Sequence, residues 1–162
     1  MLNSFNNNLP RPILAAGFGN IFMADDGIGC RLINHLQRQK DCYPKADLVD
    51  LSSNGLALVH KLEGREKLIV VDCAEMGELP GRMLRFNQAQ VRSRKRGMRF
   101  SLHQLDLMQI MNLASFLGRL PKEVVVFGIQ PCRVAPGDEI STVLSESFEK
   151  YAEEIAAEIC KG

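Results

Sequence analysis

Two adjacent aspartates are the first residues of this sequence whose type and spacing suggest chemistry. Asp25 and Asp26 follow the glycine-containing stretch Gly17-Phe18-Gly19-Asn20 and stand directly before Gly27. Paired carboxylates flanked by glycine suit a hard or borderline cation. An acid at this place also commonly caps the helix that follows. We expect both roles here, with one aspartate capping that helix and the other pointing into a cleft.

A third acid, Asp72, directly follows the apolar residues 68–71. A carboxylate is costly deep inside a sheet without a partner, so we expect Asp72 at the mouth of the sheet. An exposed loop acid is the alternative. Acids at strand ends in α/β folds often belong to functional sites, which favours a functional role for Asp72.

The stretch Ser101-Leu102-His103-Gln104 has the spacing of a capping box, so Ser101 is predicted to begin a helix. His103 then falls in the first turn, where the helix dipole disfavours the imidazolium form. A neutral imidazole binds metal or accepts a proton, although a histidine hydrogen-bonded in a loop is an equal alternative. His35 and His60 lie on predicted helices without a nearby acid cluster, and we interpret them as surface or packing residues.

Asp26, Asp72 and His103 together form a candidate ligand set from three separate loops. Two carboxylates and one imidazole with open coordination positions fit a hydrolytic divalent metal site. A cysteine hydrolase that pairs Cys73 with His103 is the alternative chemistry. Burial is the usual state of a free cysteine, which makes that alternative the weaker one.

The elements that must hold these residues alternate along the chain. Continuous apolar runs predict strands, and residues spaced by three or four predict helices. The predicted strands are 12–17, 46–51, 67–73 and 123–128, with an edge strand at 82–86, and the predicted helices are 28–40, 55–62, 104–117 and 141–160. Helix 104–117 is apolar nearly all round and is expected to be buried. This order predicts an α/β domain, a mostly parallel sheet with helices on both faces. Ligands in such folds bind beyond the carboxyl ends of the strands, near a topological switch point.

Composition sets further limits. The chain has 162 residues and a formal net charge of +1, which argues against general nucleic-acid binding. Five cysteines without a Cys-x-x-Cys pair predict reduced, mostly buried thiols in a cytoplasmic protein. No apolar run is long enough for a membrane span. We expect residues 1–11 to form a flexible leader and residues 12–162 to form a single domain.

A nucleotide cofactor is not expected. A dinucleotide fingerprint needs a small residue three positions after Gly19, and Phe22 stands there. We expect its ring to prevent close packing of the following helix on the first strand.

Four blocks of this sequence resemble the hydrogenase maturation endopeptidases in their order and spacing, over nearly the whole domain. The blocks are the glycine-containing stretch with Asp25-Asp26-Gly27-Ile28-Gly29, then Leu68-Ile69-Val70-Val71-Asp72-Cys73-Ala74, His103-Gln104-Leu105 and Gly128-Ile129-Gln130-Pro131. That family removes the C-terminal extension from the precursor of the nickel-containing hydrogenase large subunit, after nickel insertion. The resemblance implies a twisted five-stranded sheet between helices.

The resemblance also implies roles for individual residues. It places the metal-binding and catalytic positions on Asp26, Asp72 and His103, with nickel supplied by the precursor. Substrate contacts are expected at Gly19, Asn20, Asp50, Gln104 and Gln130. The family has a glycine-rich turn after its second strand, whereas this chain has Ser52 and Ser53 there, which weakens the assignment of Asp50. A non-catalytic nickel-binding chaperone of the same precursor is the alternative function, and a monomer is compatible with the sequence.

Charge is distributed unevenly along the chain. Five basic residues lie directly upstream of His103, and seven acids lie between positions 138 and 158; the basic residues are Arg92, Arg94, Lys95, Arg96 and Arg99. A solvated loop and a solvated helix face explain this simply. The alternative is that the basic cluster contacts an acidic patch on the precursor.

Overall fold

The computed structural model describes residues 9–93, 99–100 and 107–162. Strands and helices alternate through most of this chain, as the sequence predicts. The strands are β1 (Ile13–Phe18), β2 (Ala46–Ser52), β3 (Lys67–Glu75), β4 (Met83–Asn87), β5 (Arg99–Phe100) and β6 (Glu123–Ile129). The helices are η1 (Ala24–Gly27), α1 (Ile28–Gln37), η2 (Lys40–Cys42), α2 (Gly55–Lys61), α3 (Gln88–Ser93), α4 (Leu107–Phe116) and α5 (Thr142–Cys160).

Five strands form the main sheet in the order β2-β1-β3-β6-β4. The first four are parallel, and β4 pairs antiparallel with β6 at one edge. The short β5 adds to β3 by antiparallel pairing at Ala74 and Glu75. The predicted mostly parallel five-stranded α/β fold is confirmed, and the predicted edge strand is β4.

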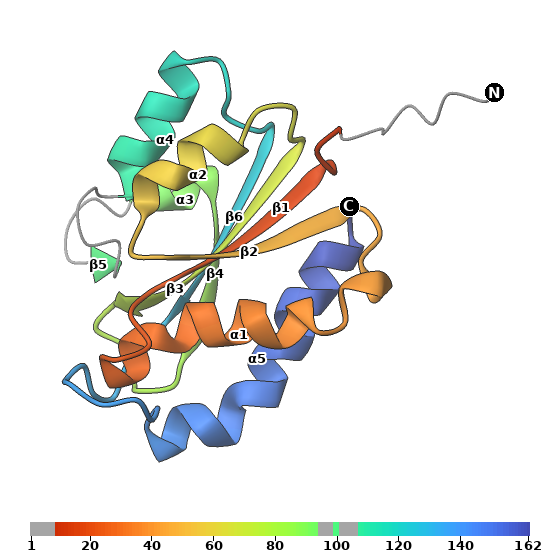
Figure 1. Ribbon diagram of the computed structural model, residues 1–162. Helices are drawn as coiled ribbons and strands as arrows, with labels where there is room; N and C mark the ends of the chain where they lie inside the picture. The colour runs from red at the N-terminus through yellow and green to blue at the C-terminus, as the bar shows by residue number, and fades with distance from the viewer. Residues whose placement is uncertain (1–8, 94–98, 101–106) are drawn as a thin grey trace.

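Helices cover both faces of the sheet. Figure 1 shows α1 and α5 on one face and α2, α3 and α4 on the other. All six residues of β1 are buried, since each face of the strand contacts a helical layer. Ile13 and Ala15 belong to the core beneath α1 and α5, and Leu14, Ala16 and Phe18 belong to the core beneath the other helices. None of the helices in the described residues is both long and apolar enough to cross a lipid bilayer.

The sheet has its topological switch point between β1 and β3. The chain leaves β1 through α1 towards β2 on one side, and returns from β2 through α2 to β3 on the other side of β1. The loops at the carboxyl ends of β1 and β3 therefore diverge and leave room for a ligand between them. This is the edge of the sheet where the sequence places Asp26 and Asp72.

Three expectations about the elements need correction. β3 continues two residues past its predicted end, to Glu75, while α3 and β5 are additional short elements. α4 is not buried all round, because Phe116 is 88% exposed and Leu113 also reaches solvent, as does Leu117 directly after the helix. Only one side of α4 packs on the sheet, through residues such as Ile110 and Ala114.

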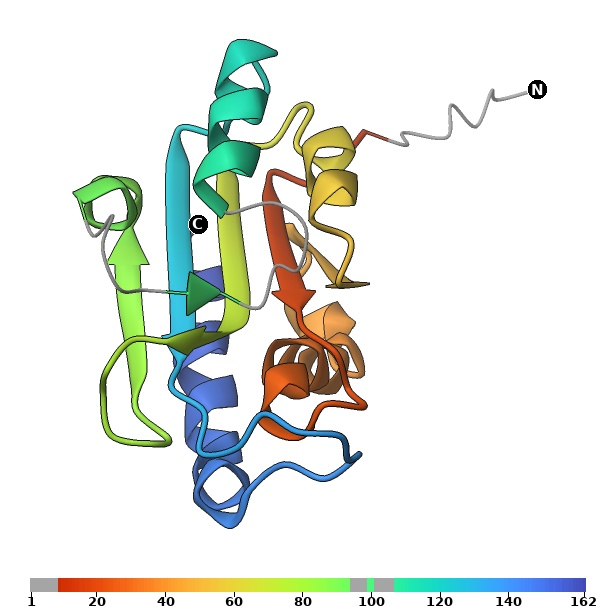
Figure 2. The same cartoon turned by 90° about the vertical axis from the view of Figure 1, so that its left-hand side faces the viewer.

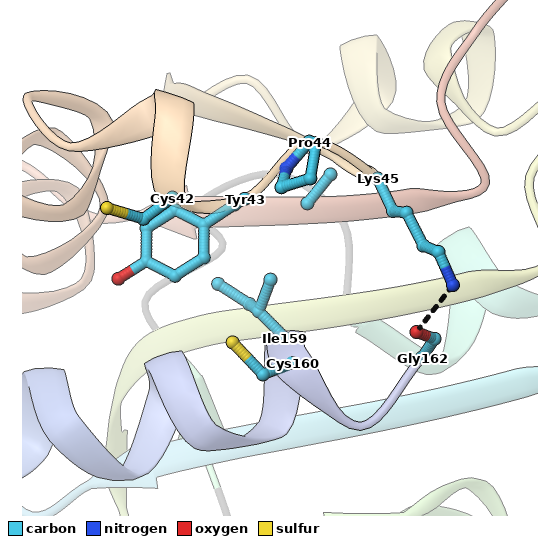
Figure 3. Close-up of a pocket in the computed structure, with 8 residues that line it drawn as sticks. Cys42, Tyr43, Pro44, Lys45, Ile159, Cys160 and Gly162 are labelled. Carbon is cyan, nitrogen blue, oxygen red and sulfur yellow. Dashed lines mark hydrogen bonds between the residues drawn. The ribbon is translucent and has the colours of Figure 1, made fainter.

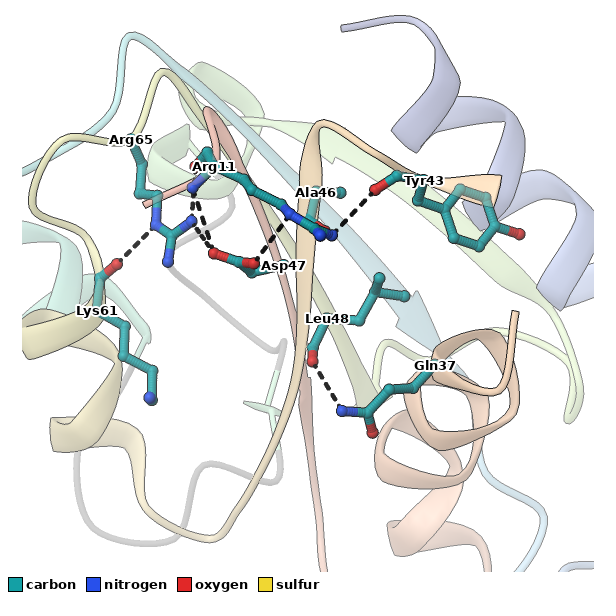
Figure 4. A network of polar contacts seen from close by, with 8 residues as sticks. All are labelled: Arg11, Gln37, Tyr43, Ala46, Asp47, Leu48, Lys61 and Arg65. Atoms are coloured by element: carbon teal, nitrogen blue, oxygen red, sulfur yellow. Dashed lines mark hydrogen bonds and ion pairs between the residues drawn. The ribbon is translucent and has the colours of Figure 1, made fainter. Parts of the chain in front are cut away.

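The end of the segment that directly precedes β1 is held against β2 by Arg11. Arg11, which we expected in a flexible leader, donates through Nη1 to the carbonyl of Ala46 at 2.8 Å and forms an ion pair with Asp47. Gln37 of α1 donates to the carbonyl of Leu48 at 3.3 Å. Figure 4 shows these side chains lying along the outer edge of β2. Residues 1–8 lie outside the described part of the chain.

The cysteines are all free, but only Cys30 and Cys73 are buried. The expectation of mostly buried thiols is therefore wrong, since Cys42, Cys132 and Cys160 are exposed. Cys42 and Cys160 line a hollow of about 220 Å³ between η2 and the end of α5 (Figure 3). This hollow lies beside the start of β2, at the opposite end of that strand from the switch point.

Candidate functional site

The loop after β1 folds tightly back onto η1. Gly19 has a φ of +128°, and a Cβ built there would lie 1.8 Å from the carbonyl oxygen of Asp26. The backbone N–H of Asn20 donates to Oδ2 of Asp26 at 2.9 Å. These contacts hold the Asp26 carboxylate in a site where the residue is only 4% exposed. A side chain at position 19 is incompatible with this geometry, which explains the glycine.

The first turn of α1 touches β3 next to Asp72. A Cβ on Gly29 would lie 2.2 Å from the carbonyl oxygen of Val71 and 2.5 Å from that of Phe18. The close contact between helix and sheet is thus made by Gly29. Phe22 is 68% exposed and does not come between the two, so our physical reason against a nucleotide site is wrong.

Asp72 lies inside β3 and is fully buried, whereas we expected it at the mouth of the sheet. On one side it is in register with Gly128 of β6. On the other side β1 pairs with β3 only as far as Gly17 and Val71, because the chain turns away after Phe18. Asp72 is thus the first residue of β3 beyond its pairing with β1, at the switch point.

The charges of Asp26 and Asp72 both affect the pKa of the buried Cys73 thiol. Burial raises the pKa of Cys73, and the charges of Asp72 and then Asp26 raise it further. η1 packs against β3, which brings the two acids to one region. A thiol held protonated by burial and by negative charge is a poor nucleophile, so the geometry disfavours a cysteine hydrolase.

Asp25 does not cap α1, although we expected one of the two aspartates to do so. The N-cap of α1 is Gly27, without a side-chain hydrogen bond. The Asp25 carboxylate instead accepts from the backbone N–H groups of Cys132, Arg133 and Ser141 and from the hydroxyl of Ser141. Burial raises the pKa of Asp25, but these hydrogen bonds outweigh it and hold the pKa below its ordinary value.

The sequence did not reveal the contact between Asp25 and the chain after β6. Ser141 is 116 positions away from Asp25, and no local pattern connects the two. The fold brings them together because β6 lies one strand beyond β3 and its loop returns towards β1.

Asp50 lies at the carboxyl end of β2, the strand beside β1. Its carboxylate accepts from Asn34 at 2.8 Å and from the backbone N–H of Ser52 at 2.8 Å. Burial raises the pKa of Asp50, but hydrogen bonds from Cys30, Asn34 and Ser52 bring it below the ordinary value. Ser52 adopts a φ of +49°, a conformation that glycine accepts more readily. This explains why a glycine is expected at that turn. The hydrogen bonds from Ser52 to the Asp50 carboxylate stabilise the serine in this conformation.

Gln130 is 5% exposed and directs its side chain inward. Its Oε1 accepts from the backbone N–H of Met76 at 2.7 Å and of Glu78 at 3.3 Å, and its Nε2 donates to Glu75 at 2.8 Å. The side chain thus ties the end of β6 to the connection between β3 and β4. These bonds use most of the amide's hydrogen-bonding capacity.

His103, Gln104 and Ser101 lie outside the described residues, as do Arg94, Lys95 and Arg96 of the basic cluster. Within the described ranges, no three histidine, cysteine or acidic side chains are placed to hold a metal ion together. Asp26 and Asp72 are therefore the part of the expected ligand set that can be located. Arg92 and Arg99 are exposed. His35 packs edge-on against Phe148 and is a packing residue, as predicted.

The chain is similar to known proteins in sequence and in fold. The family model described as hydrogenase maturation protease matches residues 30–161. The hydrogenase expression/formation protein HoxM of Cupriavidus necator is 30% identical over 87% of this chain and 70% of its own length. HupD of Bradyrhizobium diazoefficiens is 35% identical over 74% of this chain, which spans 62% of that longer protein. Among solved structures, the hydrogenase maturating endopeptidase HybD of Escherichia coli has the same fold, with a TM-score of 0.80, 24% identity and coverage of 92% of both chains.

Proposed function

The chain belongs to the hydrogenase maturation protease family, and on that premise we propose that it cleaves the C-terminal extension from a nickel-loaded hydrogenase large-subunit precursor. The observation that carries this proposal is the placement of Asp26 and Asp72. Both acids are buried, and they belong to η1 and β3, two elements that pack against each other near the switch point, where α/β folds bind their ligands.

The nickel ion belongs to the substrate in this proposal. The family is nickel-dependent, and the precursor carries the metal into the cleft. Asp26 and Asp72 supply carboxylate oxygens, and His103 supplies an imidazole nitrogen, a donor set that suits a borderline divalent cation. The burial of both carboxylates on two elements that pack together, η1 and β3, supports binding of a cation at this place.

Hydrolysis needs a nucleophile and a group that accepts a proton. One of the carboxylates, or a water molecule activated by the metal, supplies the nucleophile in our proposal. Asp26 is held by the backbone of Asn20 and is only 4% exposed, so it keeps one orientation during the reaction. Such fixed positioning lowers the barrier without rearrangement of the protein.

We assign the substrate contacts to the loops around this centre. Gly19 and Asn20 belong to the loop after β1, and Asp50 lies near the carboxyl end of β2. Gln104 directly follows His103, the proposed histidine ligand. Gln130 contributes indirectly, because its amide holds the connection after β3. We place the reaction in the cytoplasm, in keeping with five free cysteines.

The test is mass spectrometry of the precursor after incubation with the protein, with and without nickel. We expect the wild-type protein to yield a shortened product only from the nickel-loaded precursor. Asp26→Asn, Asp72→Asn and His103→Ala should each reduce cleavage by at least about 100-fold. The exposed Asp41 provides a control, because Asp41→Asn changes the same net charge and should cleave normally.

Two outcomes would contradict the proposal. Full cleavage by all three site variants would show that these residues are not the catalytic centre. Tight binding of the nickel-loaded precursor by the wild-type protein without any shortened product would identify a nickel-binding chaperone instead.

A further inference from the structure

Asp25 is a buried acid that the proposed chemistry does not use. The residue is 0% exposed, and its carboxylate receives four hydrogen bonds from three residues beyond β6. Oδ1 accepts from the N–H of Ser141 at 2.6 Å, and Oδ2 accepts from the N–H groups of Cys132 and Arg133 and from the Ser141 hydroxyl, each at 2.9 Å. We call this arrangement the Asp25 clasp. Hydrogen bonds to an ionised carboxylate are stronger than those between neutral groups.

The backbones around the clasp are joined as well. Ala24 donates to the carbonyl of Gly137 at 2.8 Å, and Gly137 donates to that of Phe22 at 2.9 Å. Asp25 also donates to the carbonyl of Arg133 at 3.2 Å. Figure 2 shows the chain after β6 running below the end of β3 towards the loop after β1 and then turning back to the start of α5. The segment and η1 therefore form one connected unit.

Ala24, directly before Asp25, shows why η1 needs external support. Its φ is +51°, a left-handed conformation that costs a non-glycine residue about 1–2 kcal/mol. Such a conformation persists only where surrounding contacts enforce it. The hydrogen bonds from Ala24 and Asp25 to the segment 131–141 are the contacts that enforce it here.

We propose that Asp25 is a positioning residue for Asp26: the clasp fixes η1 on the segment 131–141 and thereby sets the direction of the Asp26 carboxylate. Asp25 itself touches neither metal nor substrate. The inference rests on the proposed function only where it concerns catalysis. The clasp as a structural link stands independently of that function.

The first measurement tests the link by amide hydrogen exchange. Asp25→Asn keeps the size of the side chain but replaces one acceptor oxygen with an amide group facing an N–H donor. We expect exchange at Cys132, Arg133 and Ser141 to accelerate at least about 10-fold, with β1 and β6 unchanged. Unchanged exchange at these three amides in a folded variant would overturn the clasp.

The second measurement tests positioning through the kinetics of precursor cleavage. We expect Asp25→Asn to lower kcat by about 10- to 100-fold with little change in KM, because a misplaced catalytic group affects the reaction more than binding. Ser141→Ala removes one of the four bonds and should lower kcat less, while Ser141→Thr retains the hydroxyl and should restore it. Ser145→Ala, one turn further along α5, is the matched control and should leave both constants unchanged.

These variants keep the result interpretable if Asp25→Asn does not fold. In that case Ser141→Ala and Ser141→Thr decide, since each leaves the carboxylate in place. Unchanged kcat in a folded Asp25→Asn variant, or an equal loss in Ser141→Ala and Ser141→Thr, contradicts the positioning role alone. A wild-type protein that leaves the nickel-loaded precursor uncut contradicts the proposed function and the positioning role with it.

Discussion

Gly29 sits where the first turn of α1 meets the backbones of β1 and β3. Its neighbours leave no room for a methyl group, since a Cβ would lie 2.2 Å from the Val71 carbonyl oxygen. The backbone of Gly29 does not require a left-handed conformation. The glycine is thus needed for close approach, and this approach determines how near η1 comes to Asp72.

Gly29→Ala should therefore damage both stability and activity. The extra methyl group must push α1 away from β3, at a cost of about 1–3 kcal/mol, and should reduce precursor cleavage by separating Asp26 from Asp72. Thermal unfolding and cleavage kinetics measure the two effects. Gly118→Ala is the control for cleavage: its φ of +67° makes alanine lower the stability, but nothing lies within 4 Å of its Cβ position, so precursor cleavage should stay normal. Wild-type stability and cleavage in Gly29→Ala would contradict this account.

Asp25 and Asp26 show how far sequence can assign roles to single residues. Their type and their glycine neighbours indicated a polar centre, and the structure places both in the loop region after β1. Asp25 is the one that supports the fold, because it binds Ser141 and the loop after β6, which are far away in sequence. The sequence alone therefore predicted a pair, but the separate roles need the tertiary contacts.

At the scale of elements, α5 is attached to the sheet by a buried ionic network. Glu158 is 2% exposed and lies 2.8 Å from Nζ of Lys67 in β3 and 2.9 Å from Nε of Arg85 in β4. The bond from Arg85 lowers the pKa of Glu158 most, against the opposing effect of burial, and Lys67 lowers it further, to about 2. The network joins the C-terminal turn of the helix to two separate strands.

This network predicts a pH-dependent contribution to stability. The pKa of Glu158 falls on folding from 4.5 to about 2, so its contribution is complete above pH 4.5 and is lost as the pH falls towards 2. We expect Glu158→Gln to lower the free energy of unfolding by about 3 kcal/mol at pH 7, with a smaller difference from wild type at acid pH. Urea unfolding at several pH values measures this. Glu153→Gln, at an exposed position of α5, is the control. A difference that does not change with pH would contradict the assignment to Glu158.

The elements also show which features sequence periodicity can predict. β1, β3 and β6 were predictable because burial on both faces demands continuous apolar runs, as in β3, whereas the edge strand β2 carries Asp47 and Asp50 within it. α3 and β5 were not, since six and two residues carry too little periodicity. For α4, apolar residues on every side of the helix conceal which side meets the sheet. Phe116 at 88% exposure could not be distinguished from the buried Ile110 by residue type.

At the scale of the molecule, basic residues form two separate groups on the surface. Arg92 and Arg99 are exposed. Arg99 of β5 lies opposite Glu75 in the antiparallel strand pairing at the carboxyl end of β3. In the second group, Arg11, Lys40, Lys61 and Arg65 line a hollow of about 380 Å³ beside Asp47. The net charge of +1 conceals this distribution.

The two basic regions permit a matched test of docking. If the basic cluster contacts an acidic patch on the precursor, then Arg92→Glu together with Arg99→Glu should raise KM several-fold at low salt, with little effect at high salt. Lys40→Glu with Lys61→Glu makes the same charge change in the second group and should leave KM unchanged. Initial cleavage rates at two ionic strengths decide the matter. An equal effect of both pairs would indicate general electrostatic attraction rather than docking at the cluster.

The outer edge of β2 has a consequence for the behaviour of the protein in concentrated solution. A strand at the border of a sheet usually leaves carbonyl groups available to another chain, which promotes aggregation. Here Arg11 and Gln37 already donate to the carbonyls of Ala46 and Leu48. A strand from another molecule must first displace these donors, so the chain carries its own protection against edge-to-edge polymerisation.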